Sequence, residues 1–304
     1  MPQRTALLFA NVASRQGTTD LAPAIEALQA GGVRILDRRP PDIQQLGAWI
    51  VEHRSDVDLV IIGGGDGTLN AAAEALIATG LPLGILPLGT ANDLARTLEI
   101  PADLAGAARV IAEERIHRID LGRVNGKHFF NVASLGLSVR LAQELDVDVK
   151  RRWGVLGYPL TLWRTIEAGR SFRAEIRCDG TPIRIRAMQI SVGNGRHYGG
   201  GMTIAADAAI DDGALDLVSV APQGLWGLIV NLPTLRWGWH EKPGQIRHWR
   251  CRELEIRTVR PIPINTDGEV TTRTPARMDV VSGAIPVFVP QTFLNNRRAD
   301  HVAG

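Results

Sequence analysis

One glycine-rich turn constrains this chain more than any other feature of its sequence. The segment Gly63–Asn70 follows a run of strand formers, Leu59–Ile62, and leads into a helix-like run, Leu69–Ala78, that Gly80 closes. Glycine lets a backbone approach phosphate closely, and the N–H groups of a first helical turn then point at the anion. The order of strand, glycine turn and helix therefore predicts an anion-binding cradle.

Asp66 stands in the middle of this turn. A carboxylate beside phosphate groups repels them unless it holds a metal ion or a hydrogen-bond donor, so the turn favours a nucleotide with Mg²⁺ over a bare phosphate. Two other phosphate motifs fit poorly. No lysine follows the glycines as a Walker A loop requires, and Thr68 takes the third place of a dinucleotide fingerprint on a strand that is not the first.

Strand and helix patterns alternate from residue 5 to about 122, which predicts a parallel sheet covered by helices. Strands are expected at Ala6–Phe9, Val33–Leu36, Leu59–Ile62 and Leu83–Leu86, and helices at Leu21–Gly31, Ile43–Arg54, Leu69–Ala78 and from Leu94 onward. Ligands of such sheets bind at the carboxyl ends of the strands. A second turn, Leu88–Thr90, should therefore lie on the same edge as the first, with Thr90 or Asn92 capping the next helix.

After Asp120 the sequence pattern changes to short strands separated by turn signals, which predicts an antiparallel β domain. The expected strands are Ile119–Val124, His128–Val132, Phe172–Cys178, Pro182–Val192, Leu215–Val220, Cys251–Thr258 and Arg277–Val281, with helices at Val139–Lys150 and Tyr158–Ala168. A last strand, Ile285–Val289, should return to the first domain, and the polar tail from Asn295 should be frayed. The predicted domains are residues 1–122 and 123–284, with 285–304 as the returning segment.

A third segment that could carry catalytic residues is Asn265-Thr266-Asp267-Gly268-Glu269. Residues two apart on an extended chain face the same side, so Asp267 and Glu269 could point into one cleft. One carboxylate could then hold a metal or orient an acceptor while the other accepts a proton. The alternative is an ordinary Asp-Gly turn followed by a solvated glutamate.

Composition narrows the class of protein. The 304 residues are 45% hydrophobic and 22% charged, which is typical of a soluble globular chain of two domains. A net charge of +2 gives no argument for nucleic acid. Cys178 and Cys251 stand alone without metal-ligand spacing, so we expect no zinc site and a reduced, intracellular chain. Asn231 and Pro233 interrupt the most apolar segment, so any membrane contact should be peripheral.

Three segments combine tryptophan with cationic or apolar neighbours, as interfacial segments do. Each could be a membrane-docking surface, or could simply pack in the core or at its rim. They are Lys150–Trp153, Trp226–Leu232 and Arg236–Trp239.

Taken together, these motifs resemble the diacylglycerol kinase-like lipid kinase family in its bacterial branch, related to sphingosine and ceramide kinases and distantly to NAD kinases. The matching segments run in family order over nearly the whole chain: Gly64–Asn70, Pro87–Arg96, Asn194–Gly195, Gly199–Met202, Asp211–Asp216 and Asp267–Glu269. The resemblance implies an α/β fold of two domains, an NAD-kinase-like parallel α/β domain and an antiparallel β-sandwich domain.

The resemblance also implies roles for individual residues. The residues implied to bind ATP are Asn11, Ser14, Gly64, Gly65, Asp66, Gly67, Thr68, Leu69, Asn70 and Thr90. The catalytic and Mg²⁺ network comprises Asp66, Asp93, Asp267 and Glu269, with Glu269 as general base. A separate structural Mg²⁺ is expected at Asp212 with the carbonyls of Ala209 and Ala214. Three departures weaken the detailed ATP contacts. Val12 and Ala71 stand where the family usually has proline and glutamate, and Asp37–Arg39 stands where it has a threonine that contacts the nucleotide.

The implied activity is transfer of the γ-phosphoryl group of ATP to a lipid hydroxyl, with a diacylglycerol-like acceptor and Mg²⁺ as cofactor. The implied location is the cytoplasm, at the inner face of the membrane. A homodimer is left open. Two rival interpretations are an NAD kinase, which shares the glycine turn, and a non-catalytic module that senses nucleotide or lipid. The four carboxylates favour the lipid kinase, because a sensor needs no base.

Overall fold

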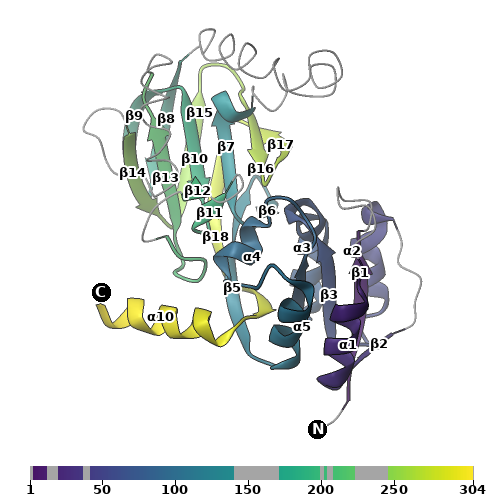
Figure 1. Cartoon of the computed structure of the whole chain (residues 1–304). Helices are drawn as coiled ribbons and strands as arrows, with labels where there is room; N and C mark the ends of the chain where they lie inside the picture. Colours follow the sequence, from purple (N-terminus) through teal and green to yellow (C-terminus); the bar gives the residue numbers. More distant parts are fainter. Residues whose placement is uncertain are drawn as a thin grey trace, which may run out of the picture. The chain divides into compact units, whose positions relative to one another are not determined.

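The structure, a computed structural model, describes residues 3–11, 20–36, 42–139, 171–198, 202–203, 208–222 and 246–303 (Figure 1). These residues form two compact units. The first comprises the described residues up to Leu121 and from Ser282 onward, and the second those from Gly122 to Val281. Apart from Val139, the two helices expected between 139 and 168 lie outside the described residues, as do the three tryptophan segments.

The first unit is built on a parallel sheet. Its strand order is β2 (Val33–Ile35), β1 (Arg4–Ala10), β3 (Leu59–Gly64), β4 (Leu83–Pro87) and the end of β18 (Ala276–Phe288), and each neighbouring pair is parallel. All residues of the central strand β3 are buried. Parallel strands buried on both faces need helices on the sheet, and Figure 1 shows helices flanking these strands. The predicted α/β domain and its returning last strand are confirmed.

The helices of the first unit pack in pairs. Helix α1 (Ala22–Ala30) contacts α5 (Leu104–Ala112), and α2 (Leu46–Glu52), preceded by the short η1 (Ile43–Gln45), contacts α3 (Asp66–Thr79). Helix α3 ends at Gly80, whose φ of 67° is the left-handed conformation that glycine adopts without strain. The helix expected from Leu94 is α4 (Asp93–Thr97) and ends after five residues. Helix α5 was not predicted.

The second unit is a sandwich of two antiparallel sheets. One has the order β18, β15 (Glu253–Thr258), β8 (Phe172–Cys178) and β9 (Thr181–Ala187). The other has the order β14 (Ile246–Cys251), β13 (Leu215–Val220), β10 (Gln189–Gly193), β7 (Val132–Gly136), β16 (Pro263–Thr266) and β17 (Glu269–Arg273). Side chains of both sheets share one core, in which Ile176 and Ile256 come from the first and Ile190 and Leu217 from the second. The predicted β-sandwich is confirmed.

Several strand boundaries differ from the expectation. The chain over 127–136 forms two strands, β6 (Lys127–Phe129) and β7, and the run Pro182–Val192 is divided between β9 and β10. Conversely, the two strands expected between Arg277 and Val289 are one, β18. At both divisions the chain passes from one sheet to the other, and no Gly or Pro stands between the strands to mark the boundary. Strands β5 (Ile116–Val124) and β18 both continue from one unit into the other.

The expectation of a frayed tail is wrong. Residues Gln291–Ala303 form helix α10. Phe293 is buried and meets the ring of His117 edge-on, and the Asn296 amide donates to Glu99 Oε1 at 2.7 Å. These long-range contacts hold a segment whose polar composition alone would leave it disordered.

The expectation of two reduced cysteines is also wrong. Cys178 at the end of β8 and Cys251 at the end of β14 form a disulfide, with Cα atoms 5.5 Å apart and a sequence separation of 73. The bond joins the two sheets of the sandwich. Nothing in the spacing of the cysteines signals it, because they come together only when the two sheets pack face to face. A short hairpin, β11 (His197–Tyr198) with β12 (Met202–Thr203), completes the described elements of this unit.

Candidate functional site

The first glycine turn joins β3 directly to α3. Gly64 ends the strand, and a Cβ at this position would lie 2.6 Å from the Cβ of Thr68, so only glycine fits. Gly65 is extended, and its carbonyl accepts the N–H of Thr68 at 3.0 Å as the helix begins. A Cβ at Gly67 would meet nothing within 4 Å, so the turn has open space beside it. The start of α3 therefore lies in a segment of glycines whose backbone no side chain covers. An anion site at a helix N-terminus requires such access.

Other predicted nucleotide-site residues surround this turn. Asn11 follows β1, donates its N–H to the Gly63 carbonyl at 2.8 Å, and its amide reaches the Thr68 hydroxyl at 3.5 Å. Asn70 is half-buried on α3, and its Oδ1 has no hydrogen-bond partner among the described residues. Leu69 is buried in the core, so only its backbone is available to a ligand. Ser14 lies outside the described residues.

The second glycine turn packs against the first, as predicted from the parallel strands that precede them. Gly64 of β3 is in register with Pro87 of β4, and a Cβ at Gly89 would lie 2.5 Å from the Cα of Gly65. Asn92 locks this turn, because its Oδ1 accepts the Gly89 N–H at 2.9 Å and its Nδ2 donates to the Gly89 carbonyl at 2.8 Å. Thr90 is exposed at its tip.

Asp66 connects the two turns. Its Oδ2 accepts the N–H of Asp93 and its Oδ1 the N–H of Leu94, both at 3.1 Å. The sequence suggested Thr90 or Asn92 as the cap of α4. Asn92 is the N-cap residue, but its side chain makes no capping hydrogen bond. The cap comes instead from Asp66 in the first glycine turn. Asp93 is buried. The carboxylate predicted to serve Mg²⁺ therefore also fixes the spacing of the two turns.

The Asp267 turn lies in the second unit, between β16 and β17. Asp267 and Gly268 have φ values of 47° and 103°, which belong to a tight hairpin turn. The Asp267 carboxylate accepts three backbone N–H groups, from Phe130 at 2.7 Å, Asn131 at 3.0 Å and Val132 at 2.9 Å. The premise of an extended chain at this position is wrong, because the turn directs Asp267 toward the segment between β6 and β7.

Glu269 begins β17 and is exposed. Asn194, directly after β10, supports the same segment, because its Nδ2 donates to the Phe130 carbonyl at 2.9 Å and its N–H to the Asn131 carbonyl at 2.9 Å. The hairpin that carries Glu269 is thus held to a fixed backbone segment by a charged anchor. Sequence reasoning missed this anchoring role because the partners lie some 135 residues earlier in the chain.

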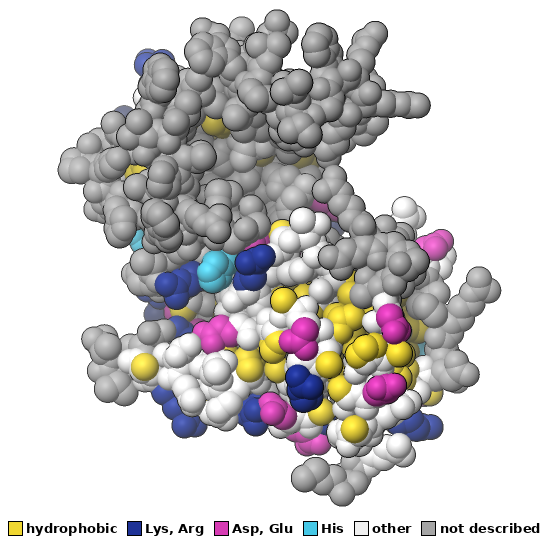
Figure 2. Space-filling view, viewed as in Figure 1, with side chains coloured by type: hydrophobic (Ala, Val, Ile, Leu, Met, Phe, Trp, Pro, Cys, Tyr) yellow, Lys and Arg dark blue, Asp and Glu magenta, His cyan; other side chains and the backbone are white. Residues whose placement is uncertain are grey.

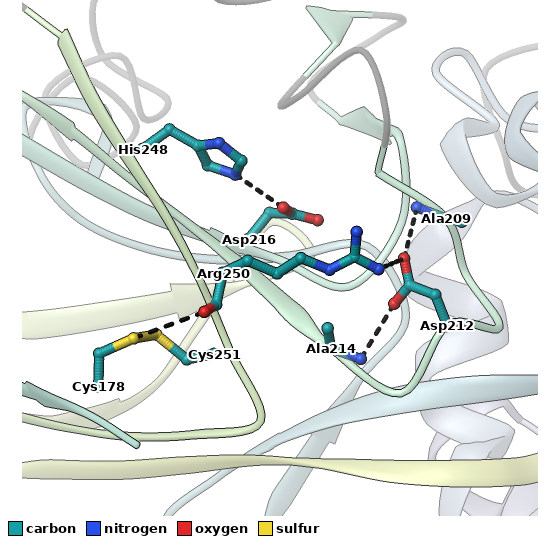
Figure 3. A network of polar contacts seen from close by, with 8 residues as sticks. All are labelled: Cys178, Ala209, Asp212, Ala214, Asp216, His248, Arg250 and Cys251. Carbon is teal, nitrogen blue, oxygen red and sulfur yellow. Dashed lines mark hydrogen bonds and ion pairs between the residues drawn. A yellow bond between two sulfur atoms is a disulfide. The ribbon is translucent and has the colours of Figure 1, made fainter. Parts of the chain in front are cut away.

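The loop predicted to hold a structural Mg²⁺ has a different arrangement (Figure 3). The two Asp212 oxygens accept the N–H groups of Ala209, at 3.2 Å, and Ala214, at 3.0 Å, and Arg250 Nη2 lies 2.5 Å from Oδ2. Burial raises the pKa of Asp212 to about 6; Arg250 opposes this rise, Asp216 adds to it, and the two N–H groups oppose it. Asp216 is buried, with Oδ1 2.7 Å from His248 Nε2.

This donor set does not fit a divalent cation. Mg²⁺ requires oxygen ligands in near-octahedral geometry, whereas both Asp212 oxygens are bonded to N–H groups and a guanidinium stands where a cation would bind. Ala209 and Ala214 present N–H groups to Asp212. Within the described ranges, no three His, Cys, Asp or Glu side chains are grouped to hold a metal. Arg250 gave no signal in the sequence, because it reaches Asp212 from a neighbouring strand.

Comparison with known proteins agrees with this architecture, a parallel α/β unit with paired glycine turns joined to an antiparallel sandwich. Residues 5–124 match the family described as the diacylglycerol kinase catalytic domain, and residues 131–289 the YegS C-terminal NAD kinase beta sandwich-like domain. The fold matches a crystal structure of a proposed diacylglycerol kinase from Bacillus anthracis with a TM-score of 0.80 and 28% identity, covering 96% of each chain.

Two curated relatives carry the same assignment. A "Probable lipid kinase YegS-like" protein of Yersinia enterocolitica is 33% identical over 283 residues, 90% of this chain and 93% of its own. A "Diacylglycerol kinase" of Staphylococcus aureus is 28% identical over 249 residues, 81% of this chain and 79% of its own. The chain belongs to the diacylglycerol kinase-like lipid kinase family, in its YegS-like branch, and is a lipid kinase.

Proposed function

We propose that this lipid kinase transfers the γ-phosphoryl group of ATP to the hydroxyl of a diacylglycerol-like lipid, with Mg²⁺ as cofactor. The observation that carries the proposal is the close packing of the two glycine turns, Gly65 against Gly89, with Asp66 bonded across them. A glycine backbone that lacks side chains, at the start of a 14-residue helix, suits a polyphosphate better than a sugar or an apolar ligand.

The ATP phosphates would lie over the first turn of α3. The N–H groups there would bind the phosphate oxygens, and Asn11, Asn70 and Thr90 stand around the same turn. The buried Asn70 Oδ1 without a partner among the described residues is an acceptor that a nucleotide N–H or hydroxyl could satisfy.

Mg²⁺, when bound with ATP, would neutralise charge on the β- and γ-phosphates and keep several of its waters. Asp66 and Asp93, which begin successive helices, would serve as direct or second-sphere ligands. Asp267, whose carboxylate already accepts three backbone N–H groups, would act through water. Asp66 retains lone pairs beyond the two N–H bonds that it accepts.

In the transfer step, the lipid hydroxyl oxygen would form a bond to the γ-phosphorus while the bond between that phosphorus and the β–γ bridging oxygen breaks. ADP leaves with the electron pair of the broken bond. Glu269 would accept the hydroxyl proton. Its exposure at the start of a hairpin suits a base that meets an incoming substrate, and the Asp267 anchor would keep it in position.

The acceptor would be drawn from the cytoplasmic face of a membrane by peripheral contact. Among the described residues, no helix has the length and apolar character needed to cross a bilayer. On the face shown in Figure 2, the described basic and acidic side chains are interspersed and do not form one continuous basic field. That pattern gives no support for a nucleic acid partner.

The acceptor is tested by offering the purified chain labelled ATP and Mg²⁺ with diacylglycerol micelles, phosphatidylglycerol, sphingosine or NAD. We expect label in a lipid product, strongest with diacylglycerol. Labelled NADP with no labelled lipid would replace this proposal with the NAD kinase alternative, and no product from any acceptor would favour the sensing module.

Asp66→Ala should abolish turnover while leaving the fold intact, because it removes both the bridge between the turns and a carboxylate near the phosphates. Asp103→Ala is the matched control, since Asp103 caps α5 by accepting the Gly106 N–H at 2.7 Å. Each variant loses a helix cap, at about 1 kcal/mol of stability, and only Asp66→Ala should lose activity. Wild-type turnover in Asp66→Ala would remove Asp66 from the mechanism.

A further inference from the structure

The cluster around Asp212 in the second unit holds a charge arrangement that the lipid kinase reaction does not use (Figure 3). Asp212 lies in the loop before β13, and its side chain is 11% exposed. Arg250 lies on the adjacent strand β14, directly opposite Asp216 in the strand register, and its guanidinium reaches across to Asp212 Oδ2 at 2.5 Å. The guanidinium therefore links strand β14 to the loop before β13.

The backbone that carries Arg250 is itself fixed. The next residue, Cys251, is disulfide-bonded to Cys178, and the Arg250 carbonyl lies 3.7 Å from Cys178 Sγ. Strand pairing adds Leu215 opposite Cys251. The sandwich therefore fixes the backbone at Arg250, while the side chain, 43% exposed, reaches from the surface of β14 to Asp212.

A guanidinium supplies what a bound cation would supply to this loop. It carries a permanent positive charge and several N–H donors, and it offsets the negative charge of a carboxylate that is mostly removed from water. The guanidinium occupies the side of Oδ2 that a metal ion would use, and the Ala209 and Ala214 N–H groups already orient the two oxygens.

We propose that Arg250 takes the place of the structural cation expected at Asp212, so that the loop before β13 is held by an internal ion pair and needs no divalent metal. The inference concerns only the second unit and does not depend on the nucleotide or the lipid acceptor. Without Arg250, Asp212 would join Asp216, whose Oδ2 has no hydrogen-bond partner among the described residues, and the two carboxylates would bind a divalent cation.

The first test uses the full chain without nucleotide and Mn²⁺ as the probe, followed by electron paramagnetic resonance. We expect Mn²⁺ binding to wild type and to Asp212→Asn to be the same, and the melting temperature of wild type to be unchanged when EDTA replaces Mg²⁺. A Mn²⁺ ion that wild type binds and Asp212→Asn loses would overturn the proposal. So would a wild-type melting temperature that falls in EDTA while that of Asp212→Asn does not respond.

The second test is a gain of metal binding. Arg250→Gln keeps a polar side chain and removes the charge; we expect it to bind Mn²⁺ and to melt at a higher temperature with Mg²⁺ than with EDTA. Adding Asp212→Asn to this variant should weaken the binding by at least about tenfold. Arg247→Gln, on an exposed position of the same strand, is the control and should gain nothing.

A folded Arg250→Gln that binds no more Mn²⁺ than the Arg247→Gln control would contradict the role of Arg250. If Arg250→Gln does not fold, the comparison of wild type with Asp212→Asn decides the question alone.

Discussion

The glycine turns of the first unit and the acidic turns of the second build their geometry in opposite ways. At the glycine turns, the missing side chains allow two backbone segments to touch, and neighbouring strands β3 and β4 bring them together. At Asp267 and Asp212, charged side chains hold backbone or a guanidinium that belongs to other parts of the chain. The glycine turns depend on the absence of a Cβ atom, and the acidic turns depend on partners far away in sequence. Substitutions in the two regions should therefore affect activity and stability differently.

Glu269→Gln should have the largest effect on turnover, a loss of roughly 10²- to 10⁴-fold, which is the usual contribution of a general base. Its stability should stay at the wild-type value, because the side chain is exposed. Lipid phosphorylation and urea unfolding measure the two quantities. Glu175→Gln, another exposed glutamate of the same unit, is the control. Undiminished turnover in Glu269→Gln would assign the base to another residue.

Gly89→Ala should reduce kcat/KM by about 100-fold, because the added Cβ would force the two turns apart and misplace the phosphate-binding backbone. The matched control is Gly47→Ala on α2, where the Cβ would make only ordinary contacts at 3.7–3.8 Å. We expect normal kinetics and equal or slightly higher stability there, since alanine favours the helix. Equal activity in the two variants would show that close packing of the turns is unimportant.

Asp267→Asn tests the acidic turns of the second unit. The amide cannot accept the three N–H groups of Phe130–Val132 as a carboxylate does, so the free energy of unfolding should fall by about 2–3 kcal/mol. Asp179→Asn is a suitable control, because Asp179 also accepts backbone N–H groups but is exposed. Unfolding in urea checks both. A loss no larger than that of Asp179→Asn would mean that Asp267 is not the anchor of its hairpin.

The sequence predicted the parts of this protein that follow local rules. Strand and helix periodicity predicted the α/β unit, and Gly80 correctly marked the end of α3. The shared edge of the two glycine turns followed from parallel strand order alone. The alternation of apolar and polar residues likewise predicted most strands of the sandwich, and burial does alternate along β8 and β15.

What could not be predicted depends on contacts between distant residues. Helix α10 forms because Phe293 is buried and Asn296 contacts Glu99, and neither contact appears in its polar composition. The Cys178–Cys251 disulfide and the Arg250–Asp212 ion pair join residues of different strands, with no spacing pattern to announce them. Asp66 was assigned to metal binding on its chemistry, and its bonds to the N–H groups of Asp93 and Leu94 required the fold.

The most direct test of the account is a crystal structure of the chain with Mg²⁺ and a non-hydrolysable ATP analogue. We expect the analogue's phosphates at the first turn of α3, in hydrogen-bond contact with backbone N–H groups of the Gly64–Thr68 turn and beside Gly89. A nucleotide bound elsewhere, with the two glycine turns left uncovered, would contradict it.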